Sequence, residues 1–302
     1  MFEFVNTLLI GITAGSIYSL MAIAIVLVWR STRVINFATG GLALASTFVG
    51  ATILEKTGSF WIALPVAMLA GAAFSAFIEY FFLRPLLKRS GEKNQEIFLA
   101  IIATLGLLGI IKAILKFIYG DEIGSLPPPL SDKGFIVSGE SIALSPLRLM
   151  ILGIVLLLMI VLTFIFQRTN LGLSLRAASF APEISRLSGI RVDLIRTAGW
   201  AIAGAAGATA GVLQTTNGSG SVSPDSFEFT LLFVFGFVAA VIGGIESLIG
   251  AVVGSLTLGV ILAIILMYLG SSLVFFAAFV ILILVLLLRP SGIIGVKGGR
   301  RA

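Results

Sequence analysis

Side chains able to take part in chemistry are scarce in this 302-residue chain. It has no cysteine and no histidine, which excludes thiolate and disulfide chemistry and removes the commonest metal ligand and general base. The sequence G-x-x-x-x-G-K-[ST] of a phosphate-binding loop is also absent. We therefore expect no metal, no cofactor and no catalysis in the chain itself.

The acidic residues add little to this inventory. All four aspartates fall in polar segments, and no acid, lysine or arginine lies securely at the middle of an apolar run. This argues against a carrier driven by protons or sodium, which usually needs a buried ionisable group. Glu79, five residues before Arg84, is expected to form a structural, interfacial ion pair that fixes a helix end and contributes little energy.

Two apolar runs begin or break with polar and glycine residues. The first break contains Asn36, Thr39 and Gly40, and the second contains Gly243 and Gly244. Broken helices in two halves of a membrane protein indicate a translocation pathway, because irregular backbone there must face protein or water. The alternative is that both are ordinary helix starts where glycine permits tight packing.

A third candidate is the basic segment 167–196, which carries five arginines and two acids. Pro182 and Glu183 are typical of the first turn of a helix, and Gly189 is typical of a helix C-cap. We predict a helix of about two turns here, lying parallel to a membrane. Such a helix either docks into a groove of a partner protein or lies on lipid headgroups.

The elements that position these residues are apolar helices. The chain is 58% hydrophobic and 11% charged, whereas soluble domains carry roughly a quarter charged residues. The sequence predicts an all-α, polytopic membrane protein with about eight or nine transmembrane helices. The expected spans are 5–28, 37–53, 59–83, 97–118, 149–166, 197–215, 227–242, 250–267 and 272–288.

The span 197–215 differs from the others in its small residues. Gly199, Ala203, Gly207 and Gly211 recur at every fourth position, a pattern that lets helix backbones approach closely. We predict a helix buried between other helices.

The basic residues predict the orientation. With the N-terminus outside and the C-terminus in the cytoplasm, fifteen of the twenty lysines and arginines fall on the inner side, as the positive-inside rule requires. The net charge of +6 is then a consequence of topology rather than a sign of nucleic acid binding. Segment 119–148 is outside and 167–196 inside, within one permease domain, 1–302. The inner residues are Arg30, Arg33, Arg84, Lys88, Arg89, Lys93, Arg168, Arg176, Arg186, Arg191, Arg196, Arg289, Lys297, Arg300 and Arg301, and the outer ones are Lys56, Lys112, Lys116, Lys133 and Arg148.

Five stretches, in order along the chain, resemble the permease subunits of ABC importers of the branched-chain amino acid type. They are RVINFA from residue 33, Glu79 with Arg84-Pro85-Leu86, the segment 168–196, VAAVIGGIESLIG from residue 238, and Leu288-Arg289-Pro290-Ser291-Gly292. Thr39 and Gly41 depart from the family pattern, which commonly has histidine and an acid there, and Ser185 replaces the usual alanine of the coupling loop.

The resemblance implies an ATP-driven importer subunit for branched-chain or related small hydrophobic amino acids, in a bacterial or archaeal cytoplasmic membrane. It implies a second permease subunit, two cytoplasmic ATPase subunits that hold ATP and magnesium, and an extracellular binding protein. Related permeases carry urea, amides, sugars or nucleosides, and a stand-alone carrier, a channel or a scaffold remains the alternative. The residues expected to couple to the ATPases are Arg176, Glu183, Ser185, Arg186 and Gly189.

Overall fold

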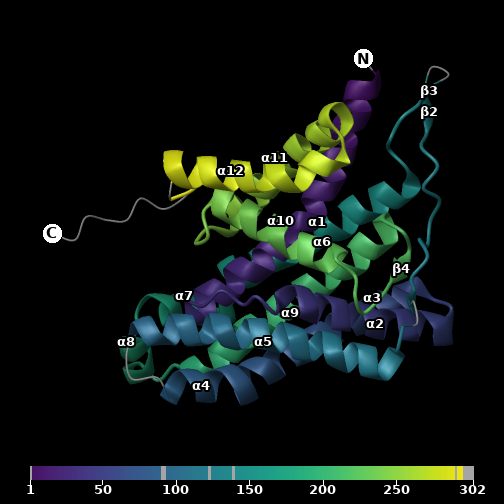
Figure 1. Cartoon of the computed structure of the whole chain (residues 1–302). Helices are drawn as coiled ribbons and strands as arrows, with labels where there is room; N and C mark the ends of the chain where they lie inside the picture. The colour runs from purple at the N-terminus through teal and green to yellow at the C-terminus, as the bar shows by residue number, and fades with distance from the viewer. Residues whose placement is uncertain (1, 90–92, 122–123, 138–139, 290, 295–302) are drawn as a thin grey trace. The chain divides into compact units, whose positions relative to one another are not determined.

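The computed structural model describes residues 2–89, 93–121, 124–137, 140–289 and 291–294 (Figure 1). Pro290, Lys297, Arg300 and Arg301, which contributed to the sequence arguments, lie outside the described residues. The helices are α1 (Phe2–Thr32), α2 (Thr39–Thr57), α3 (Phe60–Phe77), η1 (Ile78–Leu83), α4 (Arg84–Arg89), α5 (Lys93–Tyr119), α6 (Pro146–Arg168), α7 (Asn170–Phe180), α8 (Pro182–Leu187), α9 (Val192–Asn217), α10 (Glu228–Gly243), α11 (Leu248–Leu269), η2 (Ser271–Leu273) and α12 (Val274–Leu288).

The prediction of an all-α polytopic membrane protein is confirmed. Each of the nine expected spans coincides with a helix, and six helical segments of the described chain are long and apolar enough to cross a membrane. Of the other three, α10 is apolar but shorter. The remaining two, α2 and α9, are rich in glycine, alanine, serine and threonine, which lowers their hydropathy and suits them to contact with other helices rather than lipid.

The chain divides into two compact units, formed by residues 1–26, 128–155 and 234–302, and by residues 27–127 and 156–233. In the first unit, α1 packs closely on α11, where a Cβ atom on Gly15 would lie 2.7 Å from the carbonyl oxygen of Ser255. The N-terminal turn is tied to the short hairpin of β2 (Ile136–Val137) and β3 (Glu140–Ser141). The Asn6 side chain donates a hydrogen bond of 3.3 Å to the Ser141 carbonyl and accepts one of 2.6 Å from the Ala143 N–H just after β3. The single-domain expectation stays a prediction.

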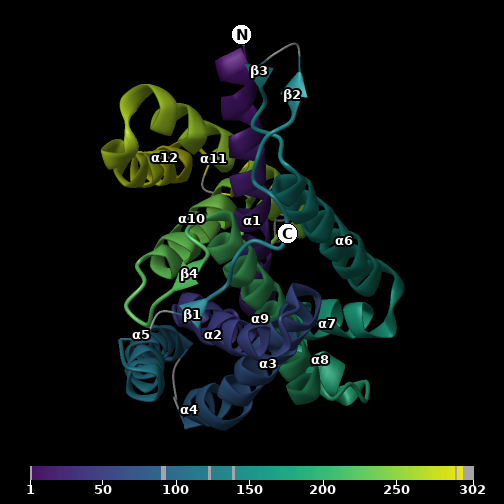
Figure 2. The same ribbon diagram turned by 90° about the vertical axis from the view of Figure 1, so that its right-hand side faces the viewer.

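The second unit contains the first helix break, the pair of Glu79 and Arg84, and the basic segment 167–196. Its centre is formed by α2, α3 and α9, which pack against one another (Figure 2). A two-stranded pairing of β1 (Gly124–Ser125) with β4 (Ser221–Val222) joins the segment after α5 to the segment after α9. The expected outer segment 119–148 is thus partly extended.

Small residues bring α9 into backbone contact with α3. A Cβ atom on Gly204 would lie 2.1 Å from the Gly71 carbonyl oxygen, and one on Gly211 would lie 2.6 Å from the Thr47 hydroxyl of α2. The predicted small face of α9 is accordingly buried at all four of its positions. The prediction of a helix enclosed by others is confirmed, and the reason is steric.

The expected span 59–83 changes its winding near its end. Residues Ile78–Leu83 form a π-helix in which the Arg84 N–H bonds to the carbonyl of Glu79, five residues back. Pro85 follows, and a proline ring clashes with the carbonyl four residues before it. A wider turn before the proline avoids this clash, and π-bulges are frequent at functional sites.

The close packing of α9 on α3 predicts that a larger side chain at Gly204 lowers the stability of the protein. Gly204→Ala places a methyl group against a backbone carbonyl that cannot rotate away, so we expect a loss of about 1–3 kcal/mol in the free energy of unfolding. Thermal unfolding of the purified protein in detergent measures it. Gly106→Ala is the matched control, since a Cβ there meets nothing within 4 Å and the substitution favours a helix. Equal melting temperatures for the two variants would contradict the packing.

Candidate functional site

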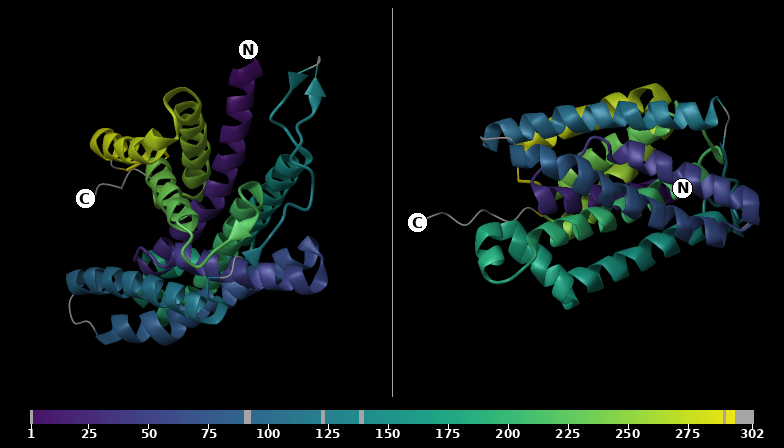
Figure 3. Two further views of the ribbon diagram at one scale, coloured as in Figure 1. Left: turned by 45° about the vertical axis from the view of Figure 1, so that its right-hand side comes forward. Right: turned by 90° about the horizontal axis from the view of Figure 1, so that it is seen from below.

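The basic segment 167–196 folds into two consecutive helices rather than one. The predicted short helix is α8, and α7 precedes it, a helix that the sequence analysis missed. Its start is capped by Thr169, whose hydroxyl accepts a hydrogen bond of 3.3 Å from the Gly172 N–H. Both helices lie in the second unit, and their teal-green ribbon can be found by its colour in Figure 3.

The boundaries of α8 have the physical causes that the sequence indicates. Pro182 occupies its first turn, where a missing N–H costs nothing. At the other end Gly189 adopts φ +84. Its N–H bonds to the Arg186 carbonyl, and the Ile190 N–H bonds to the Ser185 carbonyl. These two bonds form a Schellman cap, which requires a left-handed residue.

The five residues expected to couple to ATPases do not share one environment. Glu183, Arg186 and Gly189 on α8 and its cap are exposed, as is Arg176 on α7. Ser185 is buried, with 5% of its surface exposed. Its side chain therefore faces the unit and is not accessible to a partner.

Three large apolar side chains around α8 are exposed instead. Phe180 is 89%, Ile184 66% and Leu187 90% exposed, and we call these three residues the apolar face of α8. Ile184 and Leu187 are three residues apart and therefore lie on one side of the helix. Exposed apolar groups rimmed by polar residues mark protein or membrane contacts.

Beside α8, the first turn of α9 carries a hydrogen-bond network. Arg186 of α8 lies 3.3 Å from a carboxylate oxygen of Asp193, and the Asp193 carbonyl accepts a hydrogen bond of 2.8 Å from Arg84. Arg84 also donates to the Thr197 hydroxyl. α8, α9 and the end of the π-helix are thereby joined through side chains.

The ion pair of Glu79 and Arg84 lies at the centre of this network. Arg84 donates two hydrogen bonds to the carboxylate, of 2.6 and 3.1 Å, and Thr197 donates a third of 2.7 Å. Glu79 is only 2% exposed and the Arg84 side chain 13%. The pair is thus buried rather than interfacial, and the loss of one partner would leave an uncompensated charge. The expectation that the intact pair contributes little net energy stays a prediction.

The first helix break is also enclosed in the second unit. Thr39 begins α2, and the Asn36 carbonyl accepts a 2.7 Å hydrogen bond from its hydroxyl. Gly40 packs closely on the Phe229 carbonyl, at 2.8 Å from a Cβ position. The Asn36 side chain is 2% exposed; its oxygen accepts from the Ala38 N–H, but its Nδ2 has no hydrogen-bond partner in the described chain. A buried donor without a partner costs about 1–3 kcal/mol.

The second break belongs to the first unit and is filled by backbone. A Cβ atom on Gly243 would lie 1.9 Å from the Gly250 carbonyl oxygen. Gly244 lies against Gly292, and the Ile294 N–H bonds to the Gly243 carbonyl at 3.2 Å. These contacts leave no room for a side chain, so packing requires glycine at the break. A pathway role for Gly243 and Gly244 stays a prediction.

The other charged groups near α5 are at the surface. Lys116 donates a 2.7 Å hydrogen bond to Asp225 and lies 3.4 Å from Asp121. The bond from the Lys116 ammonium lowers the pKa of the Asp225 carboxyl. Within the part of the chain that the structure describes, no group of three or more acids is placed to hold a metal ion.

The network predicts a difference between the two ion pairs. Glu79→Ala strands the buried Arg84 guanidinium, so we expect the free energy of unfolding to fall by about 3–5 kcal/mol. Asp225→Asn opens a pair that solvent already screens and should leave the melting temperature unchanged. Thermal unfolding of the two variants measures both, and an equal effect of the two would contradict the burial of Glu79.

Comparison with known proteins identifies the family. Residues 7–288 match the model of the permease component of branched-chain amino acid transport systems. The probable branched-chain amino acid transport permease LivH of Methanocaldococcus jannaschii is 30% identical, covering 95% of this chain and 91% of that protein. The permease BraD of Pseudomonas aeruginosa is 31% identical, with 97% and 96% covered, and LivH of Escherichia coli K12 is 28% identical over the same shares. This is a family of transport permeases rather than of enzymes, and the resemblance seen in the sequence is confirmed: the chain belongs to the branched-chain amino acid permease family.

Proposed function

We propose that this chain is the permease subunit of an ATP-driven importer for branched-chain or related small hydrophobic amino acids, forming half of the translocation pathway. The observation that carries the proposal is the exposed apolar face of α8. The six-residue helix α8, held by a proline start and a Schellman cap, presents Ile184 and Leu187 to its surroundings, and Phe180 is exposed at the end of α7 just before it. An amphipathic helix of this kind fits a hydrophobic groove on a partner.

The contacts around α8 supply a route for coupling. A displacement of α8 is passed to the start of α9 through the Gly189 turn and the Arg186–Asp193 pair. The network at Arg84 passes it to the end of α3, while the close backbone contacts carry it along α9 to α2. Because packed helices shift between discrete arrangements rather than deform continuously, a push on α8 is expected to move α2, α3 and α9 together.

The first helix break is the proposed contact with the transported solute. Asn36 holds a buried amide donor that no described residue satisfies, directly before the start of α2 at Thr39. A carboxylate near this break would satisfy the donor and would also be favoured by the N-terminus of α2. The geometry of residues 36–40 supports a pathway role for Asn36, Thr39 and Gly40.

The proposed assembly has four kinds of component besides this chain. It contains a second permease, two cytoplasmic ATPase subunits that bind ATP and magnesium, an extracellular binding protein, and the lipid of a bacterial or archaeal cytoplasmic membrane. The fifteen-to-five distribution of basic residues supports an outer N-terminus and an inner C-terminus. α8 is then cytoplasmic, where ATPases are found.

Uptake by the reconstituted complex tests the substrate. The tagged chain, purified from native membranes with its partners, is placed in vesicles with ATP on the ATPase side and the binding protein on the other. We expect ATP-dependent accumulation of leucine, isoleucine or valine above that of urea, ribose or a nucleoside. Preparations without an ATPase subunit, or uptake that ignores ATP, would contradict the importer, and preference for urea or a sugar would contradict the substrate.

Variants of α8 test the coupling. Gly189→Arg places a side chain on a left-handed residue and distorts the cap, so ATP-dependent uptake should be lost, whereas Gly189→Asn should keep most of it because asparagine tolerates this conformation. Phe180→Ser with Leu187→Ser should release the ATPase subunits from the purified complex. Ile136→Ser is the control, since Ile136 is 76% exposed in the expected outer segment. Wild-type uptake by Gly189→Arg would overturn the role of α8.

A further inference from the structure

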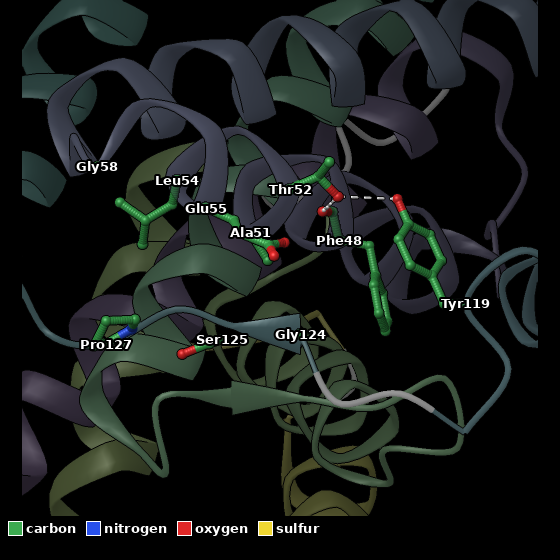
Figure 4. A pocket seen from close by; sticks show the side chains of 10 residues that line it. All are labelled: Phe48, Ala51, Thr52, Leu54, Glu55, Gly58, Tyr119, Gly124, Ser125 and Pro127. Atoms are coloured by element: carbon green, nitrogen blue, oxygen red, sulfur yellow. Dashed lines mark hydrogen bonds between the residues drawn. The ribbon is translucent and has the colours of Figure 1, made fainter.

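A cavity lies at the end of the second unit opposite α8. Its volume is about 510 Å³, within the range of roughly 300–1,000 Å³ typical of small-molecule sites. α9 starts beside α8 and runs for 26 residues, or ~39 Å, to the segment whose strand β4 pairs with β1 at the cavity. The lining residues come from α2, the end of α5 and the segment after it (Figure 4): Phe48, Ala51, Thr52, Leu54, Glu55, Gly58, Tyr119, Gly124, Ser125 and Pro127.

One wall of the cavity is aromatic and held in place. The rings of Phe48 and Tyr119 lie 4.6 Å apart. The Thr52 hydroxyl lies 3.1 Å from the Tyr119 hydroxyl and donates a 2.9 Å hydrogen bond to the Phe48 carbonyl, as Figure 4 shows. Phe48 itself is buried. The accessible part of this wall is the half-buried Tyr119, and Phe48 supports its ring. An apolar group entering the cavity meets a ring that needs no rearrangement, which lowers the cost of binding.

The charge of the lining has one sign. Among the lining residues that the structure describes, Glu55 is the one charged side chain, and none of them is a lysine or arginine. The basic residue of the last turn of α5, Lys116, is engaged by Asp225 and Asp121. A carboxylate beside an aromatic wall favours a cationic group that carries an apolar chain.

We propose that this cavity is a binding site for a free aliphatic amino acid, with the ammonium group at Glu55 and the side chain against the ring of Tyr119. The identification of this ligand rests on the proposed function, which it deepens. The α-carboxylate has no basic partner among the described lining residues and stays at the open side. With the orientation proposed above, the site faces the extracellular side, where the solute arrives before it reaches Asn36.

Three small molecules separate the two recognition elements. The full-length permease in lipid nanodiscs is titrated with leucine, with 3-methylbutylamine, which lacks the carboxylate, and with 4-methylpentanoate, which lacks the amine. Saturation-transfer NMR reports binding. We expect leucine and the amine to bind and the acid to fail. Equal binding of the acid would overturn the assignment of Glu55 as the recognition element.

Variants locate the binding. Glu55→Gln should weaken amine and leucine binding by about fivefold, the scale of an exposed ion pair, and Tyr119→Ala by about tenfold through loss of apolar contact. Tyr119→Phe keeps the ring and should bind leucine within about twofold of wild type. It thereby distinguishes the loss of the aromatic contact in Tyr119→Ala from a general effect of substitution at this position on folding. Glu140→Gln is the charge control, because Glu140 is an exposed acid in the expected outer segment 119–148.

The outcomes for the cavity and for the proposed function are distinguishable. If the wild-type complex imports leucine but Glu55→Gln and Tyr119→Ala bind it as wild type does, the cavity assignment fails and the importer stands. If the complex imports no amino acid, the proposed function fails, whatever the cavity binds. Weakened binding in both variants, with Tyr119→Phe and Glu140→Gln unchanged, establishes the site.

Discussion

The close approach of α9 to α3 and α2 is the constraint on which the second unit depends. At Gly71 and Gly204 the two backbones are so near that neither position has room for a methyl group. Helices in this contact cannot slide independently, since any relative shift brings backbone atoms into collision. The unit is therefore suited to transmit a displacement from one end of α9 to the other. The low hydropathy of α2 and α9 follows from the same requirement.

The buried ion pair of Glu79 and Arg84 extends this contact to the end where α8 lies. Such a pair is a poor source of net stability, because desolvation of the two charges offsets their attraction. The pair instead positions neighbouring segments, because Arg84 donates hydrogen bonds to the Asp193 carbonyl and the Thr197 hydroxyl as well as to Glu79. The π-helix before Pro85 sets the register that allows this. These hydrogen bonds link the end of the helix formed by α3 and η1 to the first turn of α9, next to α8.

Much of this fold could be predicted from the sequence, because apolar runs of membrane length and a four-residue period of small residues each have one physical meaning. Pro182 and Gly189 likewise predict the ends of α8 through local backbone chemistry. The contact between Glu79 and Thr197 could not be predicted, since the two are 118 residues apart and no pattern around Thr197 indicates a partner. The cavity is assembled from α2, α5 and residues 124–127 for the same reason. The glycines of the second break indicate a special backbone, but only the structure reveals that Gly250 and Gly292 fill it.

The central claim is that α8 meets an ATPase subunit, and the absence of cysteine from the chain allows a direct measurement. An Ile184→Cys variant carries a single thiol on the apolar face, and a short heterobifunctional crosslinker applied to native membranes reports its neighbour. The account predicts a crosslink to the ATPase subunit that changes in yield when ATP is bound, and none from an Ile136→Cys variant. A thiol at position 184 that reacts only with lipid-soluble reagents, and never crosslinks to an ATPase, would contradict it.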